Sequence, residues 1–205
     1  MKKLNLLTGL LCVLLPLTAC ALSGDAIEGR VLEEGTGKPI PDAIVVVRWE
    51  GRVSSLADSH GVCVHVDSMV SDSQGRYKFT RWSKSSKVGP VFNVKSIVTA
   101  YKPGYELSQE YFDKQTYRKN IYPLKLFAGT REQRLEYLLK FIGMECGPYE
   151  EYRKKLIPFY KALYEEAKSI AVTGEDKKMV ESILYNLEIV ELGFETAEKR
   201  HLARP

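Results

Sequence analysis

Hydrophobic and polar residues alternate in a series of short segments between residues 26 and 126. Residues 62–67 read Val-Cys-Val-His-Val-Asp, with valine at every second position. Other β-rich runs cover residues 27–32, 43–49, 76–79, 94–101 and 117–126, and glycine or proline stands in several of the intervals. A period of two is typical of strands with one buried face, and such intervals are typical of turns. About seven short strands within roughly 100 residues predict a β-sandwich.

Beyond residue 130 the hydrophobic positions recur with helical spacing. Thr130 and Gln133 form a capping-box pattern, which opens a helix that should run to Gly143. A second helix should begin near Pro148. Because proline lacks the N–H group that an inner helical position donates, Pro158 predicts a kink or a restart within this helix.

A third helix completes the pattern. Thr173 and Asp176 resemble another cap, and the hydrophobic stripe that follows continues to about Gly193. Residues 201–205 should form a frayed tail. The chain therefore predicts a fold that is mainly β plus α, with a β-sandwich over residues 26–126 and a helical segment over 130–200. The helical stripes should pack on each other, on the sandwich, or on both.

The N-terminus has the pattern of an export signal. Lys2 and Lys3 precede an apolar run over residues 4–17, followed by Leu-Thr-Ala-Cys at 17–20. The run is too short for a comfortable membrane span, which needs about 20 residues. Leu-Thr-Ala-Cys resembles the lipobox of bacterial lipoproteins, which implies a signal peptide over residues 1–19 and lipid on Cys20. The alternative is an ordinary cleaved signal and a soluble secreted protein.

The lipoprotein resemblance also implies a location. Residue 21 is alanine and not the aspartate that commonly signals retention at the inner membrane. This favours the outer membrane, with the anchored protein facing the periplasm. Residues 20–25 would then be a lipidated N-terminus and short tether, and the lipid would make the membrane a partner of the protein.

Net charge gives no reason to expect nucleic-acid binding. The 205 residues contain 30 Lys and Arg and 26 Asp and Glu, a formal charge of +4. Residues 1–19 contain two lysines and no acid, so their removal leaves +2. A nearly neutral protein lacks the basic surplus that binds phosphate backbones.

The remaining cysteines form a natural pair. Cys12 lies in the signal segment and Cys20 is the lipidation candidate, which leaves Cys63 and Cys146. An even pair in an oxidising compartment predicts a disulfide, and the alternative is two buried thiols.

Three segments resemble the carboxypeptidase regulatory-like domain. They are the strand and Thr-Gly-Lys-Pro-Ile turn within residues 27–47, the Asp-Ser-Gln-Gly turn entering Arg-Tyr-Lys-Phe within 71–79, and Ala-Tyr-Lys-Pro-Gly-Tyr at 100–105. The resemblance covers about residues 26–126 and implies a seven-stranded, transthyretin-like sandwich. In that family the domain is a non-catalytic companion of a peptidase. No peptidase signature is present in this chain.

Two clusters could carry binding chemistry. His60, Cys63 and His65 are weak metal-ligand candidates, since Cys63 and His65 should share one face of a strand but no fourth ligand is evident, and a disulfide would remove the thiolate. A tyrosine-rich group could bind a glycan or a polypeptide, although packing between sandwich and helices is the stronger interpretation. This possible binding surface consists of Tyr101, Tyr105, Tyr111 and Tyr117.

The function that we expect is that of a non-enzymatic cell-envelope lipoprotein, acting as a structural or protein-binding module. The sequence has neither a Gly-x-Ser-x-Gly motif nor a phosphate-binding loop, and it implies no cofactor. Two alternatives stay open. The protein could bind carbohydrate or peptidoglycan, or it could be an accessory subunit of an envelope enzyme.

Overall fold

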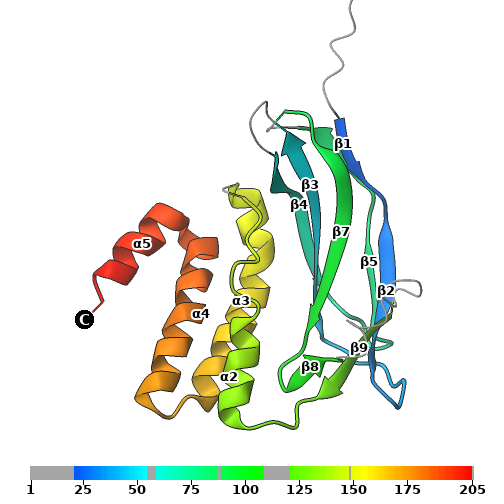
Figure 1. The fold of residues 1–205 in the computed structure, drawn as a ribbon. Helices are drawn as coiled ribbons and strands as arrows, with labels where there is room; N and C mark the ends of the chain where they lie inside the picture. The colour runs from blue at the N-terminus through cyan, green and yellow to red at the C-terminus, as the bar shows by residue number, and fades with distance from the viewer. Residues whose placement is uncertain (1–20, 55–58, 87–88, 109–120, 148, 205) are drawn as a thin grey trace, which may run out of the picture.

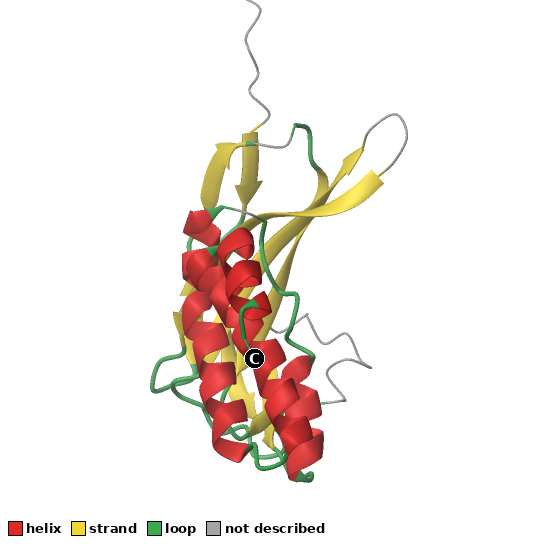
Figure 2. Ribbon diagram, turned by 90° about the vertical axis from the view of Figure 1, so that its left-hand side faces the viewer, coloured by secondary structure: helices red, strands yellow, loops and turns green. Residues whose placement is uncertain are grey.

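The chain folds into layers of sheet and helix. The computed structural model describes residues 21–54, 59–86, 89–108, 121–147 and 149–204. Two β-layers face each other, and a layer of helices covers the outer face of one of them (Figures 1 and 2). The fold is therefore β plus α, as the two hydrophobic periods predicted.

The described residues contain nine strands in three sheets. One sheet has the order β4–β3–β7, a second has the order β5–β2–β9–β8, and β1 pairs with β6. The strands are β1 Ala21–Gly24, β2 Ile27–Glu33, β3 Ile44–Ser54, β4 Ser59–Val70, β5 Arg76–Phe79, β6 Trp82–Ser85, β7 Phe92–Tyr101, β8 Tyr105–Leu107 and β9 Ile121–Leu126. The pairings are antiparallel except for β2 with β9, which run parallel.

Strand β3 is the middle strand of the three-stranded sheet, and this sheet separates two hydrophobic cores. Val45 and Val47 are buried in the core between the sheets, whereas Val46 points to the opposite side and is buried against the helices. Successive side chains of a strand point to opposite faces, so a strand buried on both sides is hydrophobic at every position. The continuous valine run of β3 is explained by this position.

Four helices follow the strands. They are α2 Arg131–Leu139, α3 Glu150–Ile170, α4 Gly174–Leu192 and α5 Phe194–Leu202. The capping box of Thr130 with Gln133 and that of Thr173 with Asp176 are both formed, which confirms the predicted starts of α2 and α4. α3 packs on β3 and β4 and so joins the helical layer to the three-stranded sheet.

Pro158 does not interrupt α3, so the predicted restart was wrong. The helix continues from Glu150 to Ile170 with Pro158 inside it. Proline leaves the carbonyl four residues earlier without its helical donor. The next carbonyl, that of Lys155, accepts a hydrogen bond from the Ser68 hydroxyl of β4. Ser68 of the sheet thus hydrogen-bonds to α3 next to the carbonyl that lacks a helical donor.

Residues 21–24 are a strand and not a tether. Ala21 pairs with Ser85 and Gly24 pairs with Trp82, so the segment after Cys20 belongs to the folded body. β1, β6 and β8 were not predicted. The predicted total of seven strands is accordingly too low for the described residues.

The C-terminus is also more ordered than expected. His201 and Leu202 were assigned to a frayed tail, but they form the last turn of α5. Ala197 of this helix is fully buried, and this contact holds α5 on the neighbouring helices. Because this contact forms only in the folded protein, the hydrophobic pattern did not predict that the helix extends to Leu202.

Candidate functional site

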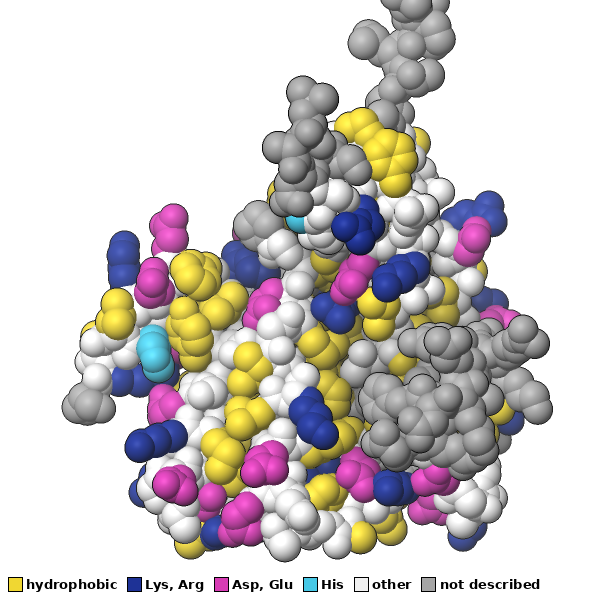
Figure 3. Space-filling model, in the orientation of Figure 1, with side chains coloured by type: hydrophobic (Ala, Val, Ile, Leu, Met, Phe, Trp, Pro, Cys, Tyr) yellow, Lys and Arg dark blue, Asp and Glu magenta, His cyan; other side chains and the backbone are white. Residues whose placement is uncertain are grey.

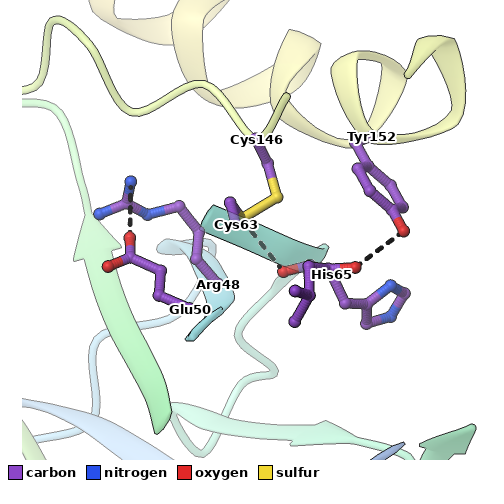
Figure 4. The surroundings of a disulfide bond; sticks show 7 residues. Arg48, Glu50, Cys63, His65, Cys146 and Tyr152 are labelled. Atoms are coloured by element: carbon purple, nitrogen blue, oxygen red, sulfur yellow. Dashed lines mark hydrogen bonds and ion pairs between the residues drawn. A yellow bond between two sulfur atoms is a disulfide. The ribbon is translucent and has the colours of Figure 1, made fainter. Parts of the chain in front are cut away.

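A disulfide joins the sheet to the helical layer. Cys63 of β4 and Cys146, in the segment before α3, are bonded with their Cα atoms 5.0 Å apart (Figure 4). Close by, the Tyr152 hydroxyl of α3 donates a hydrogen bond of 2.8 Å to the carbonyl of Val64. The pairing is the one that the cysteine count predicted. It links residues 83 positions apart in sequence.

Cys63 and His65 do not share a face, contrary to the expectation from their spacing. The β3–β4 register shifts between Trp49 and Glu50, so a β-bulge breaks the alternation at this point. Cys63 consequently packs with the helices, whereas the His65 ring lies 4.4 Å from the ring of Trp82 and 5.2 Å from that of Trp49.

The weak metal candidates do not form a site among the described residues. The Cys63 sulfur is in the disulfide. His60 is exposed and is the second residue of β4. In the described part of the chain no three His, Cys, Asp or Glu residues come together in a metal-binding group. His60, Cys63 and His65 therefore offer no ligand set in this geometry.

His65 belongs to a partly buried aromatic cluster. Its Nδ1 atom is buried without a hydrogen-bond partner among the described residues. Burial, and after it the positive charge of Lys84, lower the pKa of His65 to about 4. The Lys84 ammonium lies 4.1 Å from the centroid of the Tyr152 ring, a cation–π contact across the sheet–helix junction. Packing in this cluster favours the neutral form of the His65 imidazole.

The tyrosines proposed as a binding surface are divided between different environments. Tyr101 is 1% exposed and its hydroxyl donates to the Glu166 carboxylate, so it cannot act as an exposed platform. Burial, followed by this hydrogen bond, raises the pKa of Tyr101. Tyr105 is half-buried. Tyr111 and Tyr117 lie outside the described residues, as does Cys20.

A buried ion pair that the sequence analysis missed lies beneath Tyr101. Arg134 is 4% exposed, and its guanidinium donates two hydrogen bonds of 2.9 Å to the Glu166 carboxylate. Arg134 also donates to the carbonyl of Tyr105 at 2.6 Å. Its position in the sequence could have indicated that Arg134 is buried. Arg134 is four residues before Leu138 and therefore lies on the hydrophobic stripe of its helix.

A groove lies on the helical layer. It has a volume of about 760 Å³. It is lined by the segment before α3, by Arg153 of α3, by the second half of α4 and by both ends of α5, including Ile142, Glu145, Tyr185, Ile189, Phe194 and His201. Phe194 is 57% exposed, and the rings of Tyr185 and His201 lie 4.8 Å apart. Figure 3 shows hydrophobic side chains and a histidine together over α5 and the neighbouring helix.

Arg153 fixes the end of the groove where α4 turns into α5. Its Nη1 donates to the carbonyls of Ile189 and Val190 at 3.3 and 3.4 Å. These carbonyls lie in the last turn of α4, at the negative end of the helix dipole, and that of Ile189 also accepts from the backbone N–H of Gly193 at 2.9 Å. Gly193 then reverses the chain with a φ of +88°, a conformation that favours glycine. The Arg153 hydrogen bonds and the turn at Gly193 therefore fix the backbone at this end of the groove.

Comparison of the chain with family models, with curated proteins and with solved structures gives no significant match. Among the described helices, none is long and apolar enough to cross a membrane.

Proposed function

We propose that the protein is a non-enzymatic lipoprotein of the cell envelope, acting as a structural or protein-binding module. In this proposal Cys20 carries the lipid, and the protein faces the periplasm from the outer membrane. The sandwich is a transthyretin-like domain of the carboxypeptidase regulatory-like kind. The three sequence signatures support this assignment, since they fall on β2 and the turn after it, on the turn into β5, and on the turn between β7 and β8.

Two features of the fold are consistent with anchoring in an oxidising compartment. β1 begins at Ala21, directly after Cys20, so a lipid on Cys20 would be attached to the folded body without a linker. The Cys63–Cys146 disulfide braces the two layers, and such bonds persist where thiols are not kept reduced.

The groove on the helical layer is the observation that carries the protein-binding role. It combines hydrophobic side chains with charged groups at its edge, as protein interfaces do. Phe194 is a large aromatic side chain that stands exposed on this groove, and exposed aromatic anchors dominate interface energies. An apolar segment of another envelope protein would bury Phe194. The burial of Tyr101 removes one of the residues on which glycan binding depended.

Site-specific crosslinking in intact cells tests the protein-binding role. A photoreactive amino acid replaces Phe194 in the full-length protein, and in a second variant it replaces Leu126, which is 60% exposed on the sandwich. We expect a discrete crosslinked protein from position 194 and none from position 126. Identical products from both positions, or no product from position 194 in correctly folded protein, would contradict the proposal.

The anchor is tested separately with Cys20→Ser. The unaltered protein should incorporate a fatty-acid label and sediment with membranes, whereas the variant should do neither. Incorporation of label by Cys20→Ser, or a soluble unaltered protein, would argue for an ordinary cleaved signal.

A further inference from the structure

The end of the sandwich next to Cys20 is well defined by strand pairing. Ala21 pairs with Ser85, which fixes the residue after the anchor site to the edge of the sheet. The chain leaves Ser85 and enters β7 at Phe92, and Phe92 pairs with Arg52 near the end of β3. The start of β1, the end of β6 and the start of β7 therefore lie at one end of the molecule, as Figure 1 shows. We call this end, residues 21–23, 51–53, 59–62, 83–86 and 89–95, the anchor-proximal end.

A hydrophobic side chain is held out at this end by the local backbone. Phe92 is 55% exposed. Gly51 of β3 lacks a Cβ atom, which allows Val91 and Phe92 to approach β3 closely. A Cβ atom on Gly51 would lie 2.3 Å from Val91 Cγ1 and 3.0 Å from the Phe92 carbonyl oxygen. The β3–β7 register also shifts between Glu50 and Arg52. Figure 3 shows hydrophobic side chains gathered at the end where the described chain begins.

The charge of the anchor-proximal end has one sign. Its described residues include the cations Arg52, Lys84 and Lys95 and contain no Asp or Glu. Arg52 and Lys95 are exposed, while Lys84 lies half-buried over the Tyr152 ring. Glu50, which is paired with Lys95 in the β3–β7 register, borders this end and forms an ion pair of 3.1 Å with Arg48. The protein as a whole is close to neutral, so this segregation of charge is local.

We propose that the anchor-proximal end is a membrane-contact surface that binds an anionic phospholipid surface and orients the anchored protein. The inference rests on the lipidation of Cys20 proposed above, because that lipid would hold Ala21 one residue from the bilayer. Aromatic side chains favour the membrane–water interface, and exposed lysine and arginine are attracted to anionic headgroups. Phe92 would enter the interface while Arg52 and Lys95 contact phosphates.

Position-specific fluorescence tests the contact. The full lipidated protein is reconstituted into vesicles of phosphatidylethanolamine and phosphatidylglycerol, with an environment-sensitive dye on Phe92→Cys. The matched control carries the dye on Leu202→Cys, because Leu202 is 78% exposed on α5. We expect a spin-labelled phospholipid to quench the dye at position 92 several-fold more than the dye at 202. Adding Arg52→Glu and Lys95→Glu should reduce the quenching at position 92.

The outcomes separate this inference from the proposed anchor. Mass spectrometry of the N-terminus and flotation with vesicles report lipidation, and circular dichroism reports that each labelled variant is folded. An unlipidated protein that does not float would overturn both ideas. A lipidated, floating protein whose dye at position 92 is quenched no more than the dye at 202 would overturn the membrane-contact surface alone.

Discussion

Glu166 of α3 and Arg134 of α2 form a bidentate ion pair with two hydrogen bonds of 2.9 Å. The same carboxylate accepts from the Tyr101 hydroxyl and, at 2.9 Å, from the backbone N–H of Gly104. One buried acid thus connects two helices to the end of β7 and the turn after it. In combination with the disulfide, it fixes the helical layer to the sandwich at two separate points.

Removal of Arg134 should destabilise the protein strongly. Arg134→Met leaves a buried carboxylate without its cation, a change that costs about 3–5 kcal/mol in buried pairs. The free energy of unfolding is measured by urea denaturation. The control is Lys154→Met, which removes an exposed pair with Glu150 and should leave the free energy of unfolding nearly unchanged, because solvent screens exposed charges.

A double variant separates the lost pair from the lost packing. Arg134→Met with Glu166→Leu removes both charges and should recover part of the stability, since a hydrophobic pair can replace a buried ion pair. If Arg134→Met costs no more than Lys154→Met, the buried pair does not hold the layers together.

Loss of the disulfide should also lower stability. Because the bonded cysteines are 83 residues apart, the chain-entropy treatment gives a cost of about 4 kcal/mol for Cys63→Ser with Cys146→Ser. Urea denaturation of the oxidised protein and of this double variant measures the difference. Mass spectrometry after alkylation without reductant is the check on the starting material, and two alkylated thiols there would refute the bond.

Gly24 should not tolerate a larger residue. A Cβ atom at this position would lie 2.3 Å from Trp82 Nε1 and 2.5 Å from Trp49 Nε1. Gly24→Ala should therefore cost about 1–3 kcal/mol through overpacking. Gly61→Ala is the matched control, because Gly61 also lies in a strand and a Cβ atom there meets nothing within 4 Å. Equal thermal stability of the two variants would contradict the crowding at Gly24.

His65 should make stability fall in mild acid. Its pKa is lowered to about 4 in the folded protein, below its ordinary value of 6.5, so the unfolded chain binds the proton first as the pH falls. The contribution to stability is complete above pH 6.5 and decreases as the pH drops toward 4. Urea denaturation at pH 7 and pH 5 should show a smaller loss for His65→Gln than for the unaltered protein.

The control for this experiment is His60→Gln. His60 is exposed, so its replacement leaves the aromatic cluster around His65 intact. This variant should keep the acid sensitivity of the unaltered protein. If His65→Gln and His60→Gln respond to pH in the same way, the acid sensitivity does not come from the buried imidazole.

The elements that the sequence predicted are those whose signals are local. Period-two and β-rich runs located β2, β3, β4, β5, β7 and β9, and the capping boxes at Thr130 and Thr173 located the starts of α2 and α4. The pairing of Cys63 with Cys146 followed from counting, because only two cysteines remained. Neighbouring residues carry the strand and cap signals, and the cysteine pair required only a count, so one sequence was enough to predict these features.

Tertiary contacts decided the rest, because their energy comes from partners distant in sequence. The bulge opposite Trp49 turned Cys63 and His65 to different sides, and strand spacing could not reveal a partner's register. Tyr101 became buried because α3 covers it with Glu166. β1 became a strand because β6 pairs with it. The sequence by itself thus determined the two hydrophobic periods and the cysteine pair, whereas long-range packing determined which side chains remain at the surface.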